Sequence, residues 1–344
     1  MNELLKNLIE IESVSGNEAK IISFLQSYLE PIFPGCISLL ERNILIDFHS
    51  PLPGPTVLFC SHIDTVSPST AWTRDPFQAV QEGDRIFGLG ANDALGSVVS
   101  FIQAAQQIKG KIKHGRLLIA LVCEEEKGVC GFQKIESSLP RYDFAIFGEP
   151  TEMNIGYCMR GAMQVKVFSR GKSGHAARPW EGFNAILKAA DDLKKIEGLS
   201  LKDSSPWGGA TVVPTRVKGG TSDNQIPDFV ETLLDIRPTF DVNNEKILAL
   251  LEEANLETEV LFDRRKAMQC DVESHWVKSI QKAHPVSKLI SFGGSCDMAF
   301  STSPSVVMGP GKSERSHSAD EFILESELNA AIGIYQHVIM EFLN

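Results

Sequence analysis

Histidine and carboxylate side chains follow several short apolar segments of this 344-residue chain. His62 and Asp64 follow at the end of the run 56–60, a β-branched and apolar run that predicts a buried strand. Because residues two positions apart in an extended segment point the same way, we expect Asp64 to accept the second ring N–H of a metal-bound His62. A buried histidine bonded to an aspartate without any metal would have the same spacing. The pair therefore indicates a metal site only if further ligands join it.

A cluster of three glutamates follows the clearest buried strand of the sequence. The run 117–123 is continuously apolar and leads directly into Glu124, Glu125 and Glu126. Three adjacent carboxylates at a strand end are unfavourable unless cations neutralise them. The alternative is a charged turn in solvent, which is the usual role of a run of charges. The position of the three glutamates directly after a buried strand favours a functional site.

Three further residues have comparable positions. Glu149 follows the apolar run 142–147, His317 follows the shorter run 306–308, and Asp93 precedes a predicted helix. In open α/β sheets, ligands bind outside the carboxyl ends of the parallel strands. Two histidines and three or more carboxylates meeting there would form a ligand set for two divalent metal ions. With a spare glutamate beside them, these residues indicate hydrolysis by an activated water molecule.

Composition limits the class of protein. The chain is 43% hydrophobic and 22% charged, which is typical of a soluble globular enzyme. Its formal net charge of −11 argues against nucleic acid or an anionic membrane as a partner. No apolar stretch is long enough to span a bilayer, and the N-terminus has no signal-peptide pattern. The seven scattered cysteines have no zinc-ribbon spacing, so we expect free thiols in a reducing cytoplasm.

Hydrophobic periodicity predicts two domains. Helical and strand patterns alternate up to about residue 158 and resume near residue 271, which indicates an α/β domain with a mostly parallel sheet and helices on both faces. The intervening segment has the order strand, helix, two strands, helix, strand, which is the ferredoxin-like α+β order. We therefore expect a discontinuous catalytic domain of residues 1–160 and 271–344. Residues 161–270 would form an inserted lid or dimerisation domain.

Five motifs occur along the chain in an order that is similar to that of a known family. They are His62-Ile63-Asp64, Gly88-Leu89-Gly90-Ala91-Asn92-Asp93, Glu124-Glu125-Glu126-Lys127-Gly128, Gly148-Glu149-Pro150-Thr151 and Gly171-Lys172-Ser173-Gly174-His175. The set resembles the dinuclear zinc amidohydrolases and metallopeptidases, the family of acetylornithine deacetylase, succinyl-diaminopimelate desuccinylase, aminoacylase and carboxypeptidase G. The resemblance covers nearly the whole chain. It implies a zinc-exopeptidase-like catalytic domain.

The resemblance also implies a role for each matching residue. Two zinc ions per chain would share a bridging aspartate, with the ligand sets His62, Asp93 and Glu149 for one ion and Asp93, Glu126 and His317 for the other. Cobalt or manganese could substitute for zinc in such sites. Glu125 would be the general base, and Asp64 would orient His62. His175 would contact the substrate carbonyl oxygen, and in the family this histidine can come from the partner subunit of a dimer.

Substrate-binding positions are implied as well. Asn224 in Asn-Gln-Ile-Pro and Arg237 in Asp-Ile-Arg-Pro match positions that bind substrate in relatives. The segment Gly293-Gly294-Ser295 resembles the glycine-rich substrate loop of the family. The planar guanidinium of Arg237 suits an α-carboxylate. A structural ion pair at a strand end would also explain Arg237, and a turn would explain Asn224.

One departure from the family bears on the substrate. Many relatives carry a lysine two residues after the bridging aspartate, whereas here Asp93 is followed by Ala94-Leu95-Gly96-Ser97. This form resembles a compact acetylornithine deacetylase subgroup that acts on small acylated amino acids. We therefore expect hydrolysis of an N-acyl amino acid, with N-acetylornithine as the expected substrate and arginine biosynthesis as the context.

Other activities fit the same residues. A dipeptidase, a carboxypeptidase or a desuccinylase of the same family would have the same ligands. A non-catalytic binding module would have lost a ligand or Glu125, and all of these residues are present. Because closed twofold dimers are the commonest assembly, we expect a homodimer formed through the inserted domain.

Overall fold

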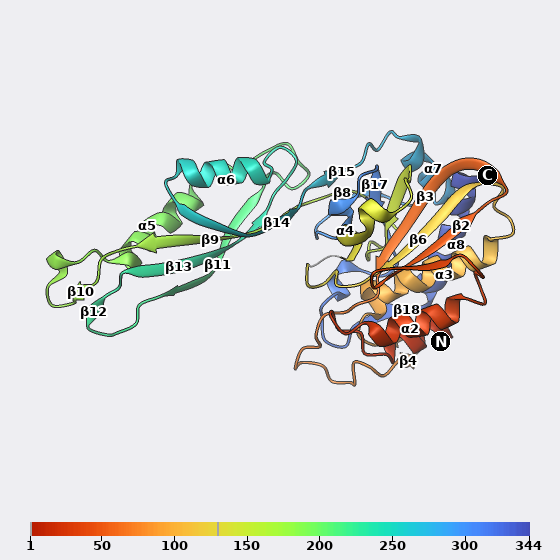
Figure 1. Ribbon diagram of the computed structural model, residues 1–344, viewed down its shortest axis with the longest axis horizontal. Coiled ribbons are helices and arrows are strands. Elements are labelled where there is room, and N and C mark those ends of the chain that lie inside the picture. The colour runs from red at the N-terminus through yellow and green to blue at the C-terminus, as the bar shows by residue number, and fades with distance from the viewer. Residues whose placement is uncertain (1, 129–130) are drawn as a thin grey trace. The chain divides into compact units, whose positions relative to one another are not determined.

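The chain forms two compact units, shown in Figure 1. The structure is a computed structural model that describes residues 2–128 and 131–344. The first unit comprises Met1–Cys158, Gln269–Phe292 and Cys296–Asn344, and the second comprises Met159–Met268 and Gly293–Ser295. The first unit is therefore discontinuous in sequence, and it contains both ends of the chain.

The first unit is built on a nine-stranded sheet with the order β1-β2-β6-β3-β7-β17-β8-β15, in which β16 also pairs with β8. Its central strands pair in parallel and are β6 (His114–Val122), β3 (Leu52–His62), β7 (Phe144–Phe147) and β17 (Ser305–Val307). The flanking strands are β1 (Ile37–Leu40), β2 (Asn43–His49), β8 (Ile155–Met159), β15 (Met268–Gln269) and β16 (Leu289–Phe292). The predicted mostly parallel sheet is confirmed. The antiparallel pairing of β1, β2 and β6 was not predicted from the sequence.

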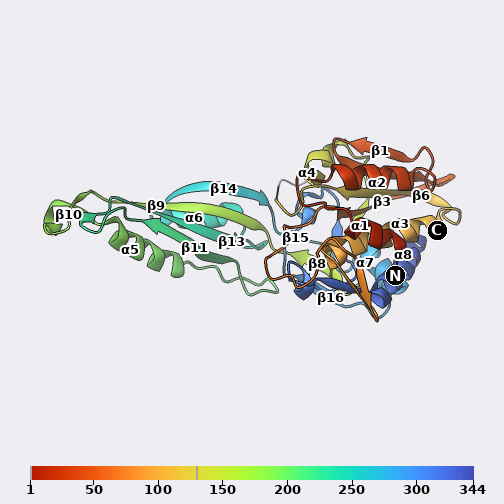
Figure 2. The ribbon, with the colours of Figure 1, turned by 90° about the horizontal axis from the view of Figure 1, so that it is seen from below.

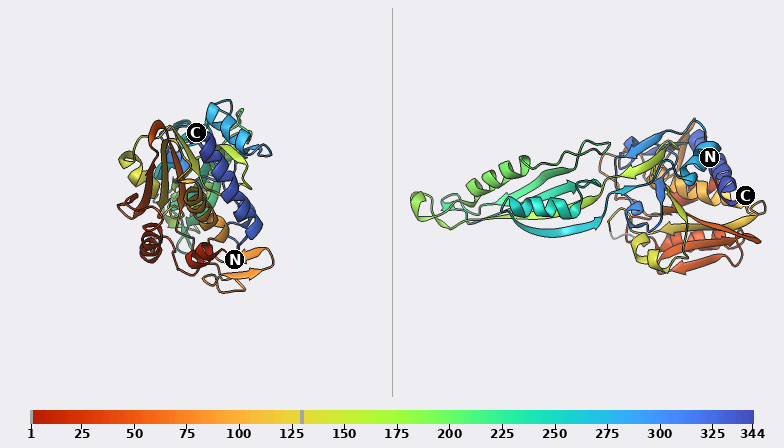
Figure 3. Two further views of the ribbon diagram at one scale, coloured as in Figure 1. Left: turned by 90° about the vertical axis from the view of Figure 1, so that its right-hand side faces the viewer. Right: turned by 90° about the horizontal axis from the view of Figure 1, so that it is seen from above.

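Helices cover both faces of this sheet, as the views in Figures 2 and 3 show. They are α1 (Glu3–Ile9), α2 (Ala19–Leu29), α3 (Gly96–Ile108), α4 (Gly131–Ile135), α7 (His275–Ala283) and α8 (Glu325–Leu343). Burial on both faces is the reason why the central strands are continuously apolar rather than alternating. Helices α3 and α8 lie side by side, and both contact β3. Phe59 of β3 contacts Phe101 and Tyr335 of these helices, with ring centroids 5.0 and 5.6 Å away.

A small antiparallel sheet joins two distant segments of the first unit. Its order is β18 (Phe322–Leu324), β5 (Arg85–Phe87) and β4 (Val80–Glu82). β5 leads into a short helical turn, η1 (Ala91–Leu95), which carries Asp93. β18 follows His317 by five positions. The pairing of β5 with β18 therefore brings the segment that carries Asp93 next to the segment that carries His317.

The second unit has a separate sheet and a separate core. Its strands are β9 (Ala162–Arg170), β11 (Thr211–Gly219), β13 (Phe229–Arg237) and β14 (Glu257–Arg265), and its helices are α5 (Ala185–Glu197) and α6 (Asn244–Glu253). The antiparallel strand order β11-β13-β9-β14 is that of a ferredoxin-like unit. Apolar residues of β9, β13 and both helices form the core, among them Val165, Leu234, Ile196 and Leu251. A separate pair of short strands, β10 (Gly174–His175) and β12 (Gln225–Ile226), completes the unit.

Two further observations concern the whole chain. In the part of the chain that the structure describes, no helix has the length and apolar character needed to cross a bilayer. Five cysteines, Cys36, Cys60, Cys123, Cys158 and Cys270, are free thiols. Cys130 lies outside the described residues.

Candidate metal centre

Three neighbouring parallel strands place candidate ligands at one edge of the sheet. His62 is the last residue of β3, Glu124–Glu126 follow β6 after one intervening residue, and Glu149 lies two residues beyond β7. Strands β6, β3 and β7 are adjacent and parallel. Their carboxyl ends therefore lie at the same edge, which is where ligands bind in open α/β sheets.

The remaining two candidates reach this edge through side-chain contacts between their loops. The side-chain Nδ2 of Asn92 donates to the carbonyl oxygen of Lys312 at 3.0 Å, and its Oδ1 accepts from the Lys312 amide at 2.9 Å. The buried carboxylate of Glu321 accepts from the amides of Asn92 and Asp93 at 2.8 and 3.0 Å. Burial raises the pKa of Glu321 to about 8. These contacts fix the chain on both sides of His317 against the turn that carries Asp93.

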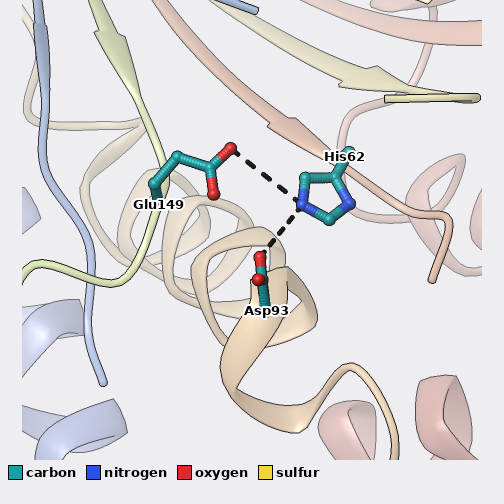
Figure 4. Close-up of side chains that lie close together, drawn as sticks. All are labelled: His62, Asp93 and Glu149. Atoms are coloured by element: carbon teal, nitrogen blue, oxygen red, sulfur yellow. Dashed lines mark hydrogen bonds and ion pairs between the residues drawn. The ribbon is translucent and has the colours of Figure 1, made fainter. Parts of the chain in front are cut away.

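The first group of converging atoms consists of His62, Asp93 and Glu149 (Figure 4). His62 Nε2 lies 3.3 Å from Asp93 Oδ1 and 4.0 Å from Glu149 Oε1. One potential ligand atom from each residue lies within 4.8 Å of those of the other two. All three side chains are largely buried, with His62 only 1% exposed. Their geometry could hold a metal ion.

The second group consists of Asp93, Glu126 and His317, with atoms that also lie within 4.8 Å of one another. His317 Nε2 lies 3.0 Å from the Glu126 carboxylate and 3.6 Å from Asp93 Oδ2. Asp93 therefore belongs to both groups and turns one oxygen toward each histidine. This is the arrangement that a bridging carboxylate between two ions requires.

The ring of His62 has a defined second partner. Its Nδ1 lies 2.9 Å from the carbonyl oxygen of Asp64, whereas the Asp64 carboxylate is 3.7 Å away. Because a carbonyl oxygen only accepts, Nδ1 carries a proton, and Nε2 is the nitrogen whose lone pair would bind a cation in place of its own proton. The expected partner residue is present, but the atom differs from the expectation. The chain turns after β3, and the carboxylate of Asp64 faces the amides of Glu125 and Glu126 instead, at 3.1 Å each.

The site has more negative than positive charge. Burial lowers the pKa of His62, but its hydrogen bond to Asp93 and the charge of Glu149 raise it well above the usual value. The hydrogen bond to Glu126 raises the pKa of His317 to about 9. Burial, and then the charge of Asp93, raise the pKa of Glu149 well above its usual value. Within the described residues, the ion pairs of Asp93, Glu126 and Glu149 involve only the two histidines. Such a donor set fits divalent cations, which would neutralise the carboxylates.

Glu125 belongs to neither group of ligand atoms, although it lies between Glu124 and Glu126. It is 6% exposed, and its charge contributes to the raised pKa of Glu149. The carboxylate is therefore close to the first group without being one of its members. That position suits a residue that transfers protons beside the metal ions.

The other predicted residues lie in the second unit. His175 is exposed on β10, and its Nδ1 accepts from the Ala177 amide at 3.0 Å. Asn224 directly precedes β12, and its carbonyl oxygen accepts from the Ala176 amide, so His175 and Asn224 lie in one loop cluster. Arg237 ends β13 and forms a two-point ion pair with Asp235, at 2.8 and 3.1 Å. The structural ion pair considered for Arg237 is therefore present.

The glycine-rich loop also groups with the second unit, because Gly293, Gly294 and Ser295 cluster there. The carbonyl oxygen of Ser295 accepts from Arg265 Nη1 at 2.8 Å, and this contact holds the loop beside β14. Each of the two units thus contains part of the predicted residue set.

Several residues next to the site were not predicted from the sequence. Glu321 was detectable only as an acidic residue directly before a short apolar run. Ser15 and Glu18 have the Ser-x-x-Glu spacing of a capping box before an apolar helix. In the structure neither side chain caps α2. Ser15 donates to the Asp64 carboxylate, and Glu18 accepts from the Glu124 amide.

The chain is similar to known proteins over most of its length. Residues 58–341 match the family model described as peptidase family M20/M25/M40. An acetylornithine deacetylase of Proteus mirabilis is 27% identical over 93% of this chain and 91% of its own length. A probable carboxypeptidase of Talaromyces marneffei is also 27% identical, over 98% of this chain and 84% of its own length. Relatives with different named activities are therefore equally similar.

Solved structures have the same fold. A tripeptidase from Staphylococcus aureus superposes with a TM-score of 0.82 at 21% identity, covering 98% of this chain and 96% of its own. A dinuclear metal-binding peptidase of the M20 family from Bacillus subtilis superposes with a TM-score of 0.72 at 18% identity, covering 99% and 97%. These likenesses establish the fold over almost the whole chain.

Proposed function

The chain belongs to peptidase family M20/M25/M40 and is a hydrolase of amide bonds, and we propose that it removes the acyl group from a small N-acyl amino acid, with N-acetylornithine as the substrate. The observation that carries this proposal is the pair of ligand groups that share Asp93. A simple buried ion pair would stabilise the fold at a lower desolvation cost than a carboxylate shared between two histidines. The shared carboxylate is therefore better explained by metal binding than by a structural role.

We assign one divalent ion to His62, Asp93 and Glu149, and a second to Asp93, Glu126 and His317. Zinc suits these imidazole and carboxylate donors, and cobalt or manganese could substitute. When bound, two such ions lower the pKa of a water molecule and polarise the amide carbonyl. The carbonyl oxygen of Asp64 keeps His62 in the tautomer that can act as a ligand.

Glu125 then acts as the general base. Its carboxylate takes a proton from the attacking water and delivers it to the leaving amine. Its burial close to Glu149 supports this role, because the carboxylate lies beside the ligand groups without belonging to either of them. The exposed ring of His175 would stabilise the negative charge that develops on the substrate oxygen.

Substrate binding is proposed for Asn224, Arg237, Gly294 and Ser295. Arg237 keeps its planar guanidinium within β13 and is 38% exposed, so its free edge could bind an α-carboxylate while Asp235 holds the other. The support for a small acylated amino acid comes from Leu95, at the position where many relatives carry lysine. Leu95 is 1% exposed and lies in the hydrophobic core, so that position presents no cation to a substrate.

A homodimer through the second unit is part of this proposal. The edge strand β11 and the adjacent helix α5 expose apolar side chains on the same unit, namely Ile186, Leu187, Val213 and Val217, which are 49 to 67% exposed. An unpaired strand edge with apolar neighbours favours pairing with a second copy. The free thiols support a location in the reducing cytoplasm.

A substrate panel tests the proposal. Zinc-reconstituted protein would be assayed with N-acetylornithine, N-acetylcitrulline, N-acetyllysine, N-succinyl-diaminopimelate and several dipeptides. We expect the highest kcat/KM with N-acetylornithine. Preferential cleavage of dipeptides would show that the protein is a peptidase, the alternative that the relative named as a probable carboxypeptidase favours. Preferential cleavage of the succinyl compound would show that it is a desuccinylase.

A further inference from the structure

The turn that carries the glutamate cluster is held by side chains rather than by strand pairing. Four successive amides beyond β6 each donate to a side-chain oxygen. Cys123 donates to Asn43 Oδ1 at 2.9 Å, and Glu124 donates to Glu18 Oε1 at 3.2 Å. Glu125 and Glu126 donate to the two oxygens of Asp64, at 3.1 Å each.

This turn needs such partners because its backbone is unusual. Glu124 has a φ of +59°, in the left-handed region that non-glycine residues seldom adopt. Such a conformation persists only where surrounding contacts determine it. The acceptors are themselves inaccessible to water, since the side chains of Glu18 and Asp64 are both fully buried. The positions of Glu125 and Glu126 therefore depend on two buried carboxylates.

The segment 13–18 supplies one of these carboxylates, that of Glu18, and holds the other, that of Asp64. Ser15 Oγ donates to Asp64 Oδ2 at 2.5 Å, and the Ser15 amide donates to the Thr65 carbonyl oxygen at 3.0 Å. Lys127 Nζ, directly after the glutamate cluster, donates to the Ser15 carbonyl oxygen. Glu18, at the end of the segment, also pairs with Arg42. The segment thus contacts the chain at Glu124 and again at Lys127, just beyond the glutamate cluster.

We propose that Ser15 and Glu18 are positioning residues, which hold the turn 124–126 so that Glu126 reaches its ion and Glu125 reaches the attacking water. This inference rests on the proposed metal-dependent function. Ser15 acts through Asp64, since its hydroxyl occupies the oxygen that also accepts from the Glu126 amide. Glu18 acts directly on the Glu124 amide. Neither side chain belongs to a ligand group.

The test compares two serine-to-alanine variants that remove the same type of bond. Ser15→Ala deletes a buried serine–aspartate hydrogen bond beside the site. Ser169→Ala deletes the equivalent bond to Asp192 in the second unit, where Ser169 Oγ lies 2.6 Å from the carboxylate and is equally buried. For each full-length variant, the readouts are metal release to a chelator, kcat and KM separately, and hydrogen exchange of the segment 117–128 in metal-free protein.

We expect Ser15→Ala to weaken binding of the ion at Glu126 by roughly 10–100-fold and to lower kcat by a similar factor, with KM little changed, because removing an outer partner of a ligand has effects of this size. The amides 124–126 should exchange faster in this variant only. Ser169→Ala should lower thermal stability but leave all three readouts as in wild type. Glu18→Gln, which keeps an accepting oxygen for the Glu124 amide, should be less impaired than Glu18→Ala.

The outcomes separate this inference from the proposed function. Folded Ser15→Ala with wild-type metal affinity, kcat and exchange would overturn the positioning role. The same result for Glu18→Ala would overturn it for that residue. Wild-type protein that binds no metal would refute the proposed function, and the exchange comparison alone would then decide whether segment 13–18 holds the turn.

Discussion

Replacing Glu125 with glutamine should abolish most of the activity while leaving the metal centre in place. Glu125 belongs to neither ligand group, whereas its neighbour Glu126 lies 3.0 Å from His317. The substitution keeps the size of the side chain. It also leaves the backbone amide that donates to Asp64, so the turn keeps its position. The change therefore removes the proton-accepting carboxylate while keeping the size of the side chain and the backbone contact to Asp64.

The expected size of the effect follows from the role of a general base. Its removal lowers kcat by roughly 10²–10⁴-fold. At about 1.4 kcal/mol for each factor of ten, this corresponds to about 3–5 kcal/mol of activation free energy. The charge of Glu125 helps to raise the pKa of Glu149, so its loss should make Glu149 easier to ionise. Metal binding by His62, Asp93 and Glu149 should therefore not require Glu125.

The assay pairs steady-state kinetics with metal analysis of the same protein sample. We expect about two equivalents of metal in Glu125→Gln and in the wild type, and less than that in Glu126→Gln. If Glu125→Gln loses metal and Glu126→Gln keeps it, the two roles have been assigned to the wrong neighbours. Retention of more than a tenth of the wild-type kcat by Glu125→Gln would refute the general-base role.

Four other predictions concern the ligands, the substrate, the assembly and the second unit. Asp93→Ala should release both ions, because one oxygen faces each histidine, and loss of a single equivalent in metal analysis would exclude bridging. Arg237→Ala should raise KM strongly for the acyl-amino acid, and equal turnover of the methyl ester by the wild type would remove Arg237 from the substrate site. If His175 acts across a dimer, mixing inactive His175→Ala and Glu125→Ala proteins should restore roughly a quarter of wild-type activity after random subunit exchange. About half of the dimers are then mixed, and each mixed dimer has one complete site out of two. No recovery despite proven exchange would place His175 in its own chain's site or outside any site. Burial raises the pKa of Asp192, but hydrogen bonds from Lys188 and Ser169 lower it below its usual value. The ionised form of Asp192 therefore stabilises the second unit above about pH 4. This stabilisation is lost as the pH falls through the folded-state pKa. Asp192→Asn should therefore cost about 1–3 kcal/mol of unfolding free energy at neutral pH, and chemical denaturation should show this difference shrinking in acid; a constant difference would contradict the role of the charge.

Much of the candidate site could be predicted because its evidence is local. Short apolar runs that end in histidine or carboxylate residues mark strand ends, and parallel strands bring those ends to one edge. His62, Glu126 and Glu149 follow this rule, and the structure places them close to Asp93 and His317. The small sheet of β4, β5 and β18 was not predicted, because strands of three residues carry too little periodicity to be recognised.

The sequence by itself determined the strand ends, the donor types and the chemistry that these donors support, since each depends on neighbouring residues and on side-chain functional groups. Only the tertiary structure decided which atoms meet. It turned the carbonyl oxygen of Asp64, not its carboxylate, toward His62, and it placed Ser15 beside a residue 49 positions away. A Ser-x-x-Glu spacing that would suit a helix cap serves instead to hold the glutamate turn. Side-chain partners are selected by packing among distant segments, and no local pattern of residues records that selection.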